Sequence, residues 1–169
     1  MALLSRKSLN TDKLHLSMAN KHRAKIRNLI VLPCFLWISS WQTNLNEAKT
    51  IAQKNHRYIL LNFSGSDWCG PCIRLKKEIF ETSVFQAMAD SELVLVNADF
   101  PRNKKNQLSA EQQKINDATA DKYNAKGIFP YTLLLNADGK ILGTWEGLPN
   151  ETPDDFIQEI KNDIYTSTR

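Results

Sequence analysis

The sequence predicts an α/β fold in which the strands of one sheet alternate with helices and an antiparallel hairpin comes late. The apolar run over 58–63 is bounded by turn residues, as is typical of a strand buried on both faces, and the segment 93–99 predicts a second strand. Segments with the helical spacing of apolar residues lie before, between and after these runs. Two later runs, 128–135 and 141–147, flank a turn over 136–140 and predict the hairpin.

The first half of the chain supplies two helical regions around the first strand. A helix is predicted over 45–55, because Asn44 and Glu47 have the spacing of a capping box. The first strand then leads through a short polar loop to Cys69. From Cys69 the apolar spacing becomes helical, and a second apolar stripe extends this region until Asp90.

The middle of the chain predicts a strand, a solvated loop and a peripheral helix. The strand over 93–99 ends at Pro101, since proline cannot continue a ladder of hydrogen bonds. The polar and basic segment 102–107, with Lys104 and Lys105, is expected to be solvated. Ser109 caps the next helix. Its thin apolar face is expected to consist of Ile115, Ala118 and Tyr123.

The last third predicts the hairpin and a final helix. The third strand, over 128–135, starts around Pro130, and Trp145 on the fourth strand is expected to be core. Thr152 caps the last helix, with Pro153 in the first turn, where proline is tolerated. The buried side of this helix is expected to consist of Phe156, Ile157, Ile160 and Ile164.

Two cysteines separated by two residues mark a candidate redox site. Cys69 and Cys72 follow a predicted strand and open a predicted helix. This spacing can close a small disulfide, and the positive end of the helix dipole favours the thiolate of Cys69. A thiolate is the form of cysteine that attacks other disulfides.

The distribution of charge argues against nucleic-acid binding. Of the 22 basic and 18 acidic residues, residues 1–40 hold seven basic residues and one acid, which leaves 15 basic and 17 acidic residues beyond. The body of the protein therefore lacks the positive surface that nucleic acids require. Its size and its 42% apolar composition allow one sizeable core and one domain.

The basic N-terminal region has the layout of a secretory signal. The basic segment 21–27 precedes an apolar stretch over 29–41, which is too short to span a bilayer comfortably, and Ser39 and Ser40 offer a cleavage point. Residues 1–40 are therefore predicted to be a signal peptide or, if uncleaved, an N-terminal membrane anchor. The predicted location is periplasmic or otherwise extracytoplasmic.

The start of the mature domain depends on this leader. The domain is predicted over 41–169, and Met18 is an alternative start that would leave 1–17 untranslated. Cleavage near residue 40 would remove Cys34 and leave Cys69 and Cys72 as an even pair. Lipid attachment at Cys34 fits poorly, because the residues before it are not small.

Two separated motifs give the chain a family resemblance. The first is Trp-Cys-Gly-Pro-Cys over 68–72, and the second, about sixty residues later, is Gly-Ile-Phe-Pro over 127–130 before an apolar run. With these motifs, residues 45–165 resemble the thioredoxin superfamily, and the segment 63–69 looks most like that of exported bacterial thioredoxin-like proteins. The resemblance implies a thioredoxin-like fold with a central mixed sheet of four to five strands flanked by helices.

The resemblance also implies roles for the site residues. Cys69 would be the exposed nucleophile and Cys72 the resolving thiol that attacks the mixed disulfide. Pro130 would be cis and lie beside the disulfide, where its neighbours can hold an extended substrate. The implied substrate-binding residues are Trp68, Gly70, Pro71, Phe129 and Pro130. No metal or cofactor is implied.

The implied reaction is the reduction of protein disulfides. The Gly70-Pro71 pair is the thioredoxin dipeptide, which favours a reductant. The implied partners are protein disulfide substrates and a membrane thiol reductase that donates electrons. Contact with a membrane is expected only through the N-terminal segment, if it stays uncleaved.

The chain departs from the thioredoxin pattern at three places. Thioredoxins keep a buried aspartate in the strand before the motif, whereas Asn62 or Phe63 stands there in this sequence. Tyr131 intervenes between Pro130 and the apolar run that follows. The connection over 100–118 is longer than in thioredoxin and is a candidate partner-recognition surface.

Other readings of the same residues remain open. A zinc site needs four ligands, and His56 is the one histidine beyond residue 40 to accompany the cysteine pair. A purely structural disulfide across so short a loop would add little stability. A non-enzymatic thioredoxin-fold module that binds a peptide or partner protein is the alternative function. Asp67 is expected to be a solvated loop acid and Asp99 a turn or cap residue.

Overall fold

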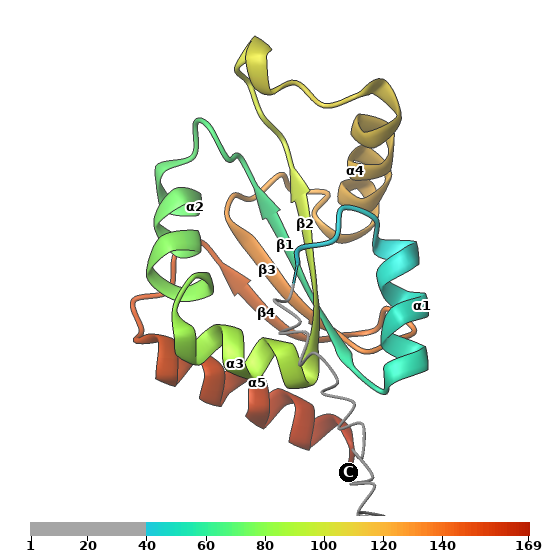
Figure 1. Ribbon diagram of the computed structural model, residues 1–169, viewed down its shortest axis with the longest axis vertical. Coiled ribbons are helices and arrows are strands. Elements are labelled where there is room, and N and C mark those ends of the chain that lie inside the picture. The colour runs from blue at the N-terminus through green and yellow to red at the C-terminus, as the bar shows by residue number, and fades with distance from the viewer. Residues whose placement is uncertain (1–39) are drawn as a thin grey trace, which may run out of the picture. The chain divides into compact units, whose positions relative to one another are not determined.

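A single mixed sheet with helices on both faces forms the domain (Figure 1). The structure is a computed structural model that describes residues 40–169. The strands are β1 (Tyr58–Ser64), β2 (Leu93–Asp99), β3 (Tyr131–Leu135) and β4 (Ile141–Glu146). The α-helices are α1 (Leu45–Asn55), α2 (Gly70–Leu75), α3 (Ser83–Glu92), α4 (Ala110–Tyr123) and α5 (Pro153–Ser167). The leader predicted over 1–40, including Met18 and Cys34, lies outside the described residues except for Ser40.

The strands follow the order β2-β1-β3-β4. β1 pairs parallel to β2, with Leu61 opposite Val96, and antiparallel to β3, with Leu61 opposite Leu133. β3 and β4 form the predicted antiparallel hairpin, with a register shift between Leu134 and Leu135. The predicted α/β class and mixed sheet of four to five strands are confirmed, with four strands.

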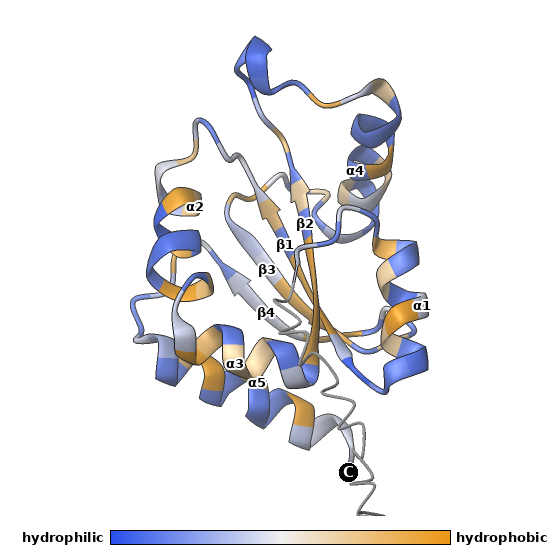
Figure 2. Cartoon of the chain, in the orientation of Figure 1, coloured by the Kyte–Doolittle hydropathy of each residue, from blue (hydrophilic) through white to orange (hydrophobic). Residues whose placement is uncertain are grey.

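Apolar residues on the two faces of the sheet form two cores. Leu60 faces the core shared with α2, α3 and α5, whereas Ile59 and Leu61 face the core shared with α1 and α4. Figure 2 shows long hydrophobic stretches along β1 and β2, between helices that carry hydrophilic residues on their outer sides. Because β1 is covered on both faces, its side chains need not alternate between apolar and polar.

The helical region after Cys69 differs from the prediction of one continuous element. α2 passes into a π-helical segment, Lys76–Phe80, and the chain then breaks before α3. Thr82 caps α3, accepting a hydrogen bond from the backbone N–H of Phe85 at 3.4 Å. A threonine at such a position starts a new helix, because its hydroxyl replaces a missing backbone acceptor. α3 then continues past Asp90 to Glu92.

The third strand is shorter than the predicted 128–135. It begins at Tyr131, because Ile128 is held by the side chain of Asn124 and Pro130 has no N–H to donate to a ladder. The backbone N–H of Ile128 donates to Asn124 Oδ1 at 2.9 Å, and Asn124 Nδ2 donates to the carbonyl oxygen of Ile128 at 2.8 Å. The segment before Pro130 is therefore a braced loop.

Two side-chain placements were predicted wrongly. Ala118 is exposed, and Asn116 instead is buried on α4, where its Nδ2 donates to the carbonyl oxygen of Asp99 at 2.8 Å. Trp145 is half-buried, because its ring packs on Phe156 while its Nε1 donates to the exposed Glu159 at 2.7 Å. The predicted buried side of α5 is confirmed at Phe156, Ile157 and Ile160, with Ile164 partly buried.

Within residues 40–169, no helix combines the length and the apolar character that crossing a membrane requires.

Candidate active site

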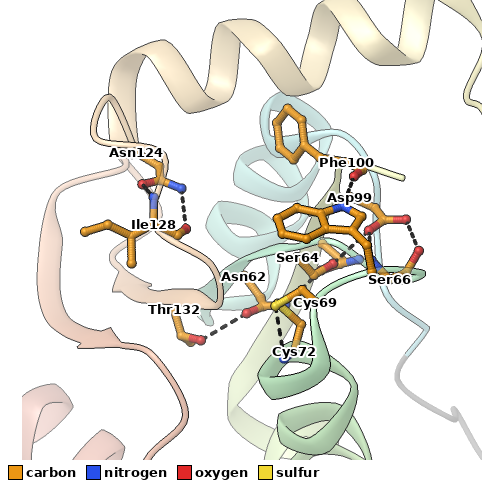
Figure 3. The surroundings of a disulfide bond; sticks show 12 residues. Asn62, Ser64, Ser66, Cys69, Cys72, Asp99, Phe100, Asn124, Ile128 and Thr132 are labelled. Atoms are coloured by element: carbon orange, nitrogen blue, oxygen red, sulfur yellow. Dashed lines mark hydrogen bonds between the residues drawn. A yellow bond between two sulfur atoms is a disulfide. The ribbon is translucent and has the colours of Figure 1, made fainter. Parts of the chain in front are cut away.

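Cys69 and Cys72 form a disulfide at the N-terminus of α2, directly after β1 (Figure 3). Cys69 is the N-cap residue of α2, and its Sγ accepts a hydrogen bond from the backbone N–H of Cys72 at 3.2 Å. Pro71 lies in the first turn, where no N–H is needed for the helix. The backbone therefore holds the sulfur of Cys69 against the positive end of the helix, where a thiolate is stabilised.

The expectation of an exposed Cys69 is wrong for this disulfide-bonded form. Cys69 and Cys72 are each 5% exposed, so the first cysteine is no more open than the second. The physical reason is the capping geometry, because the side chain of Cys69 folds back over the first turn of α2 to reach Cys72. Gly70 and Pro71 are exposed.

The Phe129-Pro130 peptide bond is cis, as the sequence predicts. Tyr131, which follows it, pairs with Phe63, and Thr132 Oγ1 donates to Asn62 Oδ1 at 3.1 Å. The cis bond therefore lies at the end of β3 that neighbours the end of β1, from which the chain runs to the disulfide. Pro130 is buried and Phe129 half-buried.

Three aromatic rings pack together around Trp68, the residue before Cys69, and we call Trp68, Phe100 and Phe129 the aromatic platform. The ring of Phe129 stands edge-on to the rings of Trp68 and Phe100, each at a centroid distance of 5.5 Å. Trp68 Nε1 donates to the carbonyl oxygen of Phe100 at 2.7 Å. Arg102 stacks on Trp68, with its guanidinium carbon 3.7 Å from the ring centroid. The sequence predicts Trp68 and Phe129 as site residues, whereas it covers Phe100 and Arg102 only as part of the candidate partner-recognition surface over 100–118.

Asp67 holds the loop that carries Arg102. Its carboxylate accepts hydrogen bonds from the backbone N–H groups of Arg102 and Asn103, both at 2.9 Å, and from Asn106 Nδ2 at 3.0 Å. The hydrogen bond from Arg102 is the main cause that lowers the pKa of Asp67. Asp67 is a half-exposed loop acid, in line with the expectation, and the structure adds that it braces the loop that carries Arg102.

Replacing Asp67 by asparagine should reduce the loss of stability in acid. Because the pKa of Asp67 is lower in the folded chain than its ordinary value of 3.8, its carboxylate stabilises the fold above that pH. This stabilisation is lost as the pH falls through the lower, folded-state pKa. Urea unfolding between pH 6 and about pH 2 should therefore show a shallower decline for Asp67→Asn. Asp138→Asn, an exposed carboxylate in the hairpin turn, is the control; equal slopes for Asp67→Asn and the unmodified chain would contradict the prediction.

Asp99 braces the loop before Trp68, as a cap residue was expected to do. Its carboxylate accepts hydrogen bonds from Ser66 N–H at 2.8 Å and from Ser64 Oγ at 3.0 Å. The two aspartates thus fix both sides of the turn that leads to Cys69.

Cys72 lines a cavity of about 450 Å³ together with Asn62, Ser64 and Asn97. Asn62 is 6% exposed; its Nδ2 donates to Asn97 Oδ1 at 2.9 Å and its Oδ1 accepts from Thr132 (Figure 3). Asn62, rather than Phe63, therefore points towards the resolving cysteine. No carboxylate is among the described residues that line this cavity.

The described residues contain no group of three or more His, Cys, Asp or Glu side chains arranged to hold a metal ion.

Comparison with known proteins places this site in a family. Residues 45–162 match the family described as the thioredoxin-like domain. The disulfide bond reductase DsbH of Chlamydia pneumoniae is 36% identical over 96 residues, which cover 57% of this chain and 56% of that protein. The thioredoxin-related protein DsbJ of the same organism is 26% identical over 112 residues, covering 66% of this chain and 31% of that protein. This chain thus spans about half the length of one relative and a third of the other.

A solved structure shares the architecture. The structure entitled DsbH oxidoreductase superposes with a TM-score of 0.68 at 29% sequence identity, covering 75% of this chain and 84% of that chain. The family match extends over all four strands and all five α-helices described above, except for the last residues of α5. The chain belongs to the thioredoxin-like domain family.

Proposed function

We propose that this protein is a thiol-disulfide oxidoreductase that reduces protein disulfides through a Cys69/Cys72 dithiol-disulfide cycle. The observation that carries the proposal is the disulfide between these cysteines at the N-terminus of α2. The cis bond before Pro130, at the neighbouring strand end, supports it, because an extended substrate can pair with backbone there. The relative DsbH is named a disulfide bond reductase, which supports electron flow from this chain to its substrates.

The reaction begins with the reduced chain. The thiolate of Cys69 attacks one sulfur of a substrate disulfide, forms a mixed disulfide and releases the other substrate sulfur as a thiolate, which takes up a proton. Cys72 loses its proton, attacks Sγ of Cys69 and releases the second substrate thiolate. The substrate gains two electrons and two protons, and the chain is left with the Cys69–Cys72 disulfide.

The cycle requires a donor that returns two electrons to this disulfide. For an extracytoplasmic protein, a membrane thiol reductase is the proposed donor. The signal-like pattern of residues 1–40 supports an extracytoplasmic, periplasmic location. A pair of cysteines also suits an oxidising compartment, where an unpaired thiol would be vulnerable.

The test is an insulin-reduction assay with dithiothreitol as the electron source. The purified full chain should accelerate the precipitation of reduced insulin over dithiothreitol alone, and the double variant Cys69→Ser/Cys72→Ser should not. Equal rates with and without the chain would reject the enzymatic proposal. That result would favour the alternative function, a non-enzymatic module that binds a peptide or partner protein. The low exposure of Cys69 is compatible with this alternative, because a binding module does not need an accessible sulfur.

Asn62 offers a way to test how Cys72 loses its proton. In the unmodified chain we expect water in the cavity to accept this proton, because the lining has no carboxylate. Asn62→Asp would place a carboxylate beside Cys72, with burial raising its pKa towards the working pH. We therefore expect faster release of the mixed disulfide near neutral pH, by roughly 100-fold or more, together with a new ionisation in the pH-rate profile.

The same substitution should cost stability, about 1–3 kcal/mol, because the amide donor to Asn97 is lost. Asn116→Asp is the control, since it places a carboxylate at a buried amide of α4 far along the chain from either cysteine. It should lower stability without adding an ionisation to the rate profile. An unchanged profile in Asn62→Asp would show that proton removal from Cys72 does not depend on this position.

A further inference from the structure

We propose that the loop over residues 100–106 selects substrates, and that it favours polypeptides carrying a carboxylate close to their disulfide. This inference rests on the proposed oxidoreductase function and concerns its substrate class. The residues that would recognise the carboxylate are Arg102, Lys104 and Lys105.

The loop is fastened to the turn that carries Cys69. At its start, the backbone N–H of Phe100 donates to the carbonyl oxygen of Ser64 at 2.8 Å, and Trp68 Nε1 donates to the carbonyl oxygen of Phe100 at 2.7 Å. Further on, Asp67 accepts hydrogen bonds from the backbone of Arg102 and Asn103. The cationic side chains are thus presented from a backbone that the active-site turn itself holds in place.

Arg102 is placed so that its charge stays free for a ligand. The guanidinium stacks on the ring of Trp68, the residue directly before Cys69, at 3.7 Å from the ring centroid. Stacking engages the flat face of a guanidinium and leaves the N–H groups at its edge available for a carboxylate. Among the described residues, no hydrogen bond or ion pair from the Arg102 side chain to a carboxylate competes for them.

The charges around this loop are unbalanced. Arg102, Lys104 and Lys105 are all exposed, and the ion pairs within residues 40–169 involve Arg74 and Lys76 instead. Of the nearby acids, Asp67 and Asp99 keep one negative charge each, but their oxygens accept hydrogen bonds from the loop backbone and from the serines of the preceding turn, and three cations outnumber them. Three cations within four residues are therefore exposed, and Arg102 among them lies on the Trp68 ring of the aromatic platform, which suits an apolar segment with an acidic residue.

The experiment uses three synthetic peptides that differ only at two positions flanking a single intramolecular disulfide. These positions hold Glu, Gln or Lys. The pre-reduced full chain reduces each peptide in a single turnover, so no electron donor is needed. Dithiothreitol reduces the same peptides in parallel, and its rate constants correct for the effect of the flanking charges on the disulfide itself.

After this correction, the chain should reduce the Glu peptide roughly fivefold faster than the Gln peptide, and the Lys peptide most slowly. The preference should collapse near 1 M salt, where charges are screened beyond about 3 Å. Arg102→Gln should remove most of the preference for the Glu peptide. Arg102→Lys should retain part of it, because lysine keeps the positive charge but lacks the planar guanidinium that stacks on Trp68. Lys104→Gln/Lys105→Gln, which changes two exposed side chains, should weaken the preference by a smaller factor.

Arg57→Gln is the matched control, because it removes the same charge just before β1 starts, at the end of the strand remote from Cys69. It should leave the order of the peptides unchanged. Two results would overturn this inference but leave the oxidoreductase proposal standing. One is equal corrected rates on the Glu and Gln peptides, and the other is a full preference in both Arg102→Gln and the double lysine variant. Failure of the chain to reduce any of the three peptides would overturn the oxidoreductase proposal on which it rests.

Discussion

Cys69→Ser should lower insulin-reducing turnover by on the order of 1000-fold or more. Cys69 caps α2, and its Sγ lies where the helix N-terminus stabilises a thiolate. A serine hydroxyl can accept the same capping hydrogen bond, so the fold should be retained. It cannot form the covalent intermediate with a substrate sulfur, because a neutral hydroxyl does not attack a disulfide at neutral pH. Steady-state insulin reduction, with circular dichroism as a check on folding, measures this effect.

Cys72→Ser separates the two roles of the pair. Here Cys69 can still attack a substrate, but no neighbouring thiol remains to release it, so the mixed disulfide should accumulate. Intact-mass measurement should find the chain carrying one substrate molecule, which dithiothreitol removes. Cys34→Ser is the control and should behave as the unmodified chain. Unchanged turnover in Cys69→Ser, or trapping through Cys72 in that variant, would contradict the assigned order of attack.

Phe156→Ala should destabilise the fold by about 3–5 kcal/mol. Phe156 on α5 is 0% exposed, and its ring lies within 6.4 Å, centroid to centroid, of the rings of Phe80, Phe85 and Trp145. Removing the ring leaves a cavity where α5, α3 and the sheet meet, and close-packed neighbours relax only partly. Since domains are typically stable by about 5–15 kcal/mol, this is a large fraction of the total.

Urea unfolding of the reduced and oxidised chain measures the change as a lower midpoint with an unchanged slope. Tyr165→Ala on the same helix is the control, because Tyr165 is 58% exposed. It should alter the free energy of unfolding by less than about 1 kcal/mol. A loss of similar size in both variants would show that α5 is held by its length and caps rather than by this aromatic cluster.

Local patterns in the sequence were sufficient to predict most of the helices and strands of the fold. The segments that became β1 and β2 are mostly apolar because most of their side chains are buried on both faces, and this leaves a clear signal. The caps at Asn44, Ser109 and Thr152 all form as predicted, because each satisfies backbone N–H groups within three residues of itself. The hairpin turn is equally local, with Gly139 at a φ of 90°.

Contacts between residues far apart in the sequence could not be predicted from local patterns. The bracing role of Asp67 could not be predicted, because its partners Arg102 and Asn103 lie 35 and 36 residues later in the chain and reach it only in the folded structure. Asn97 and Asn62 become one polar network only when β1 and β2 pair in register. The low exposure of Cys69 likewise follows from how its side chain turns over α2, which the Cys-X-X-Cys spacing does not specify. The cysteine pair was predictable because its residues are close in sequence, and the cis bond before Pro130 was expected from the resemblance to the thioredoxin superfamily.

Gly65 restricts how this sequence can diverge. A Cβ atom at this position would lie 2.2 Å from a ring carbon of Trp68, so every other amino acid would collide with the indole. A descendant of this chain can therefore replace Gly65 only if the indole of Trp68 moves or is exchanged for a smaller side chain. Either event would disturb the ring on which Arg102 stacks, so a change at Gly65 would also change the position of that guanidinium.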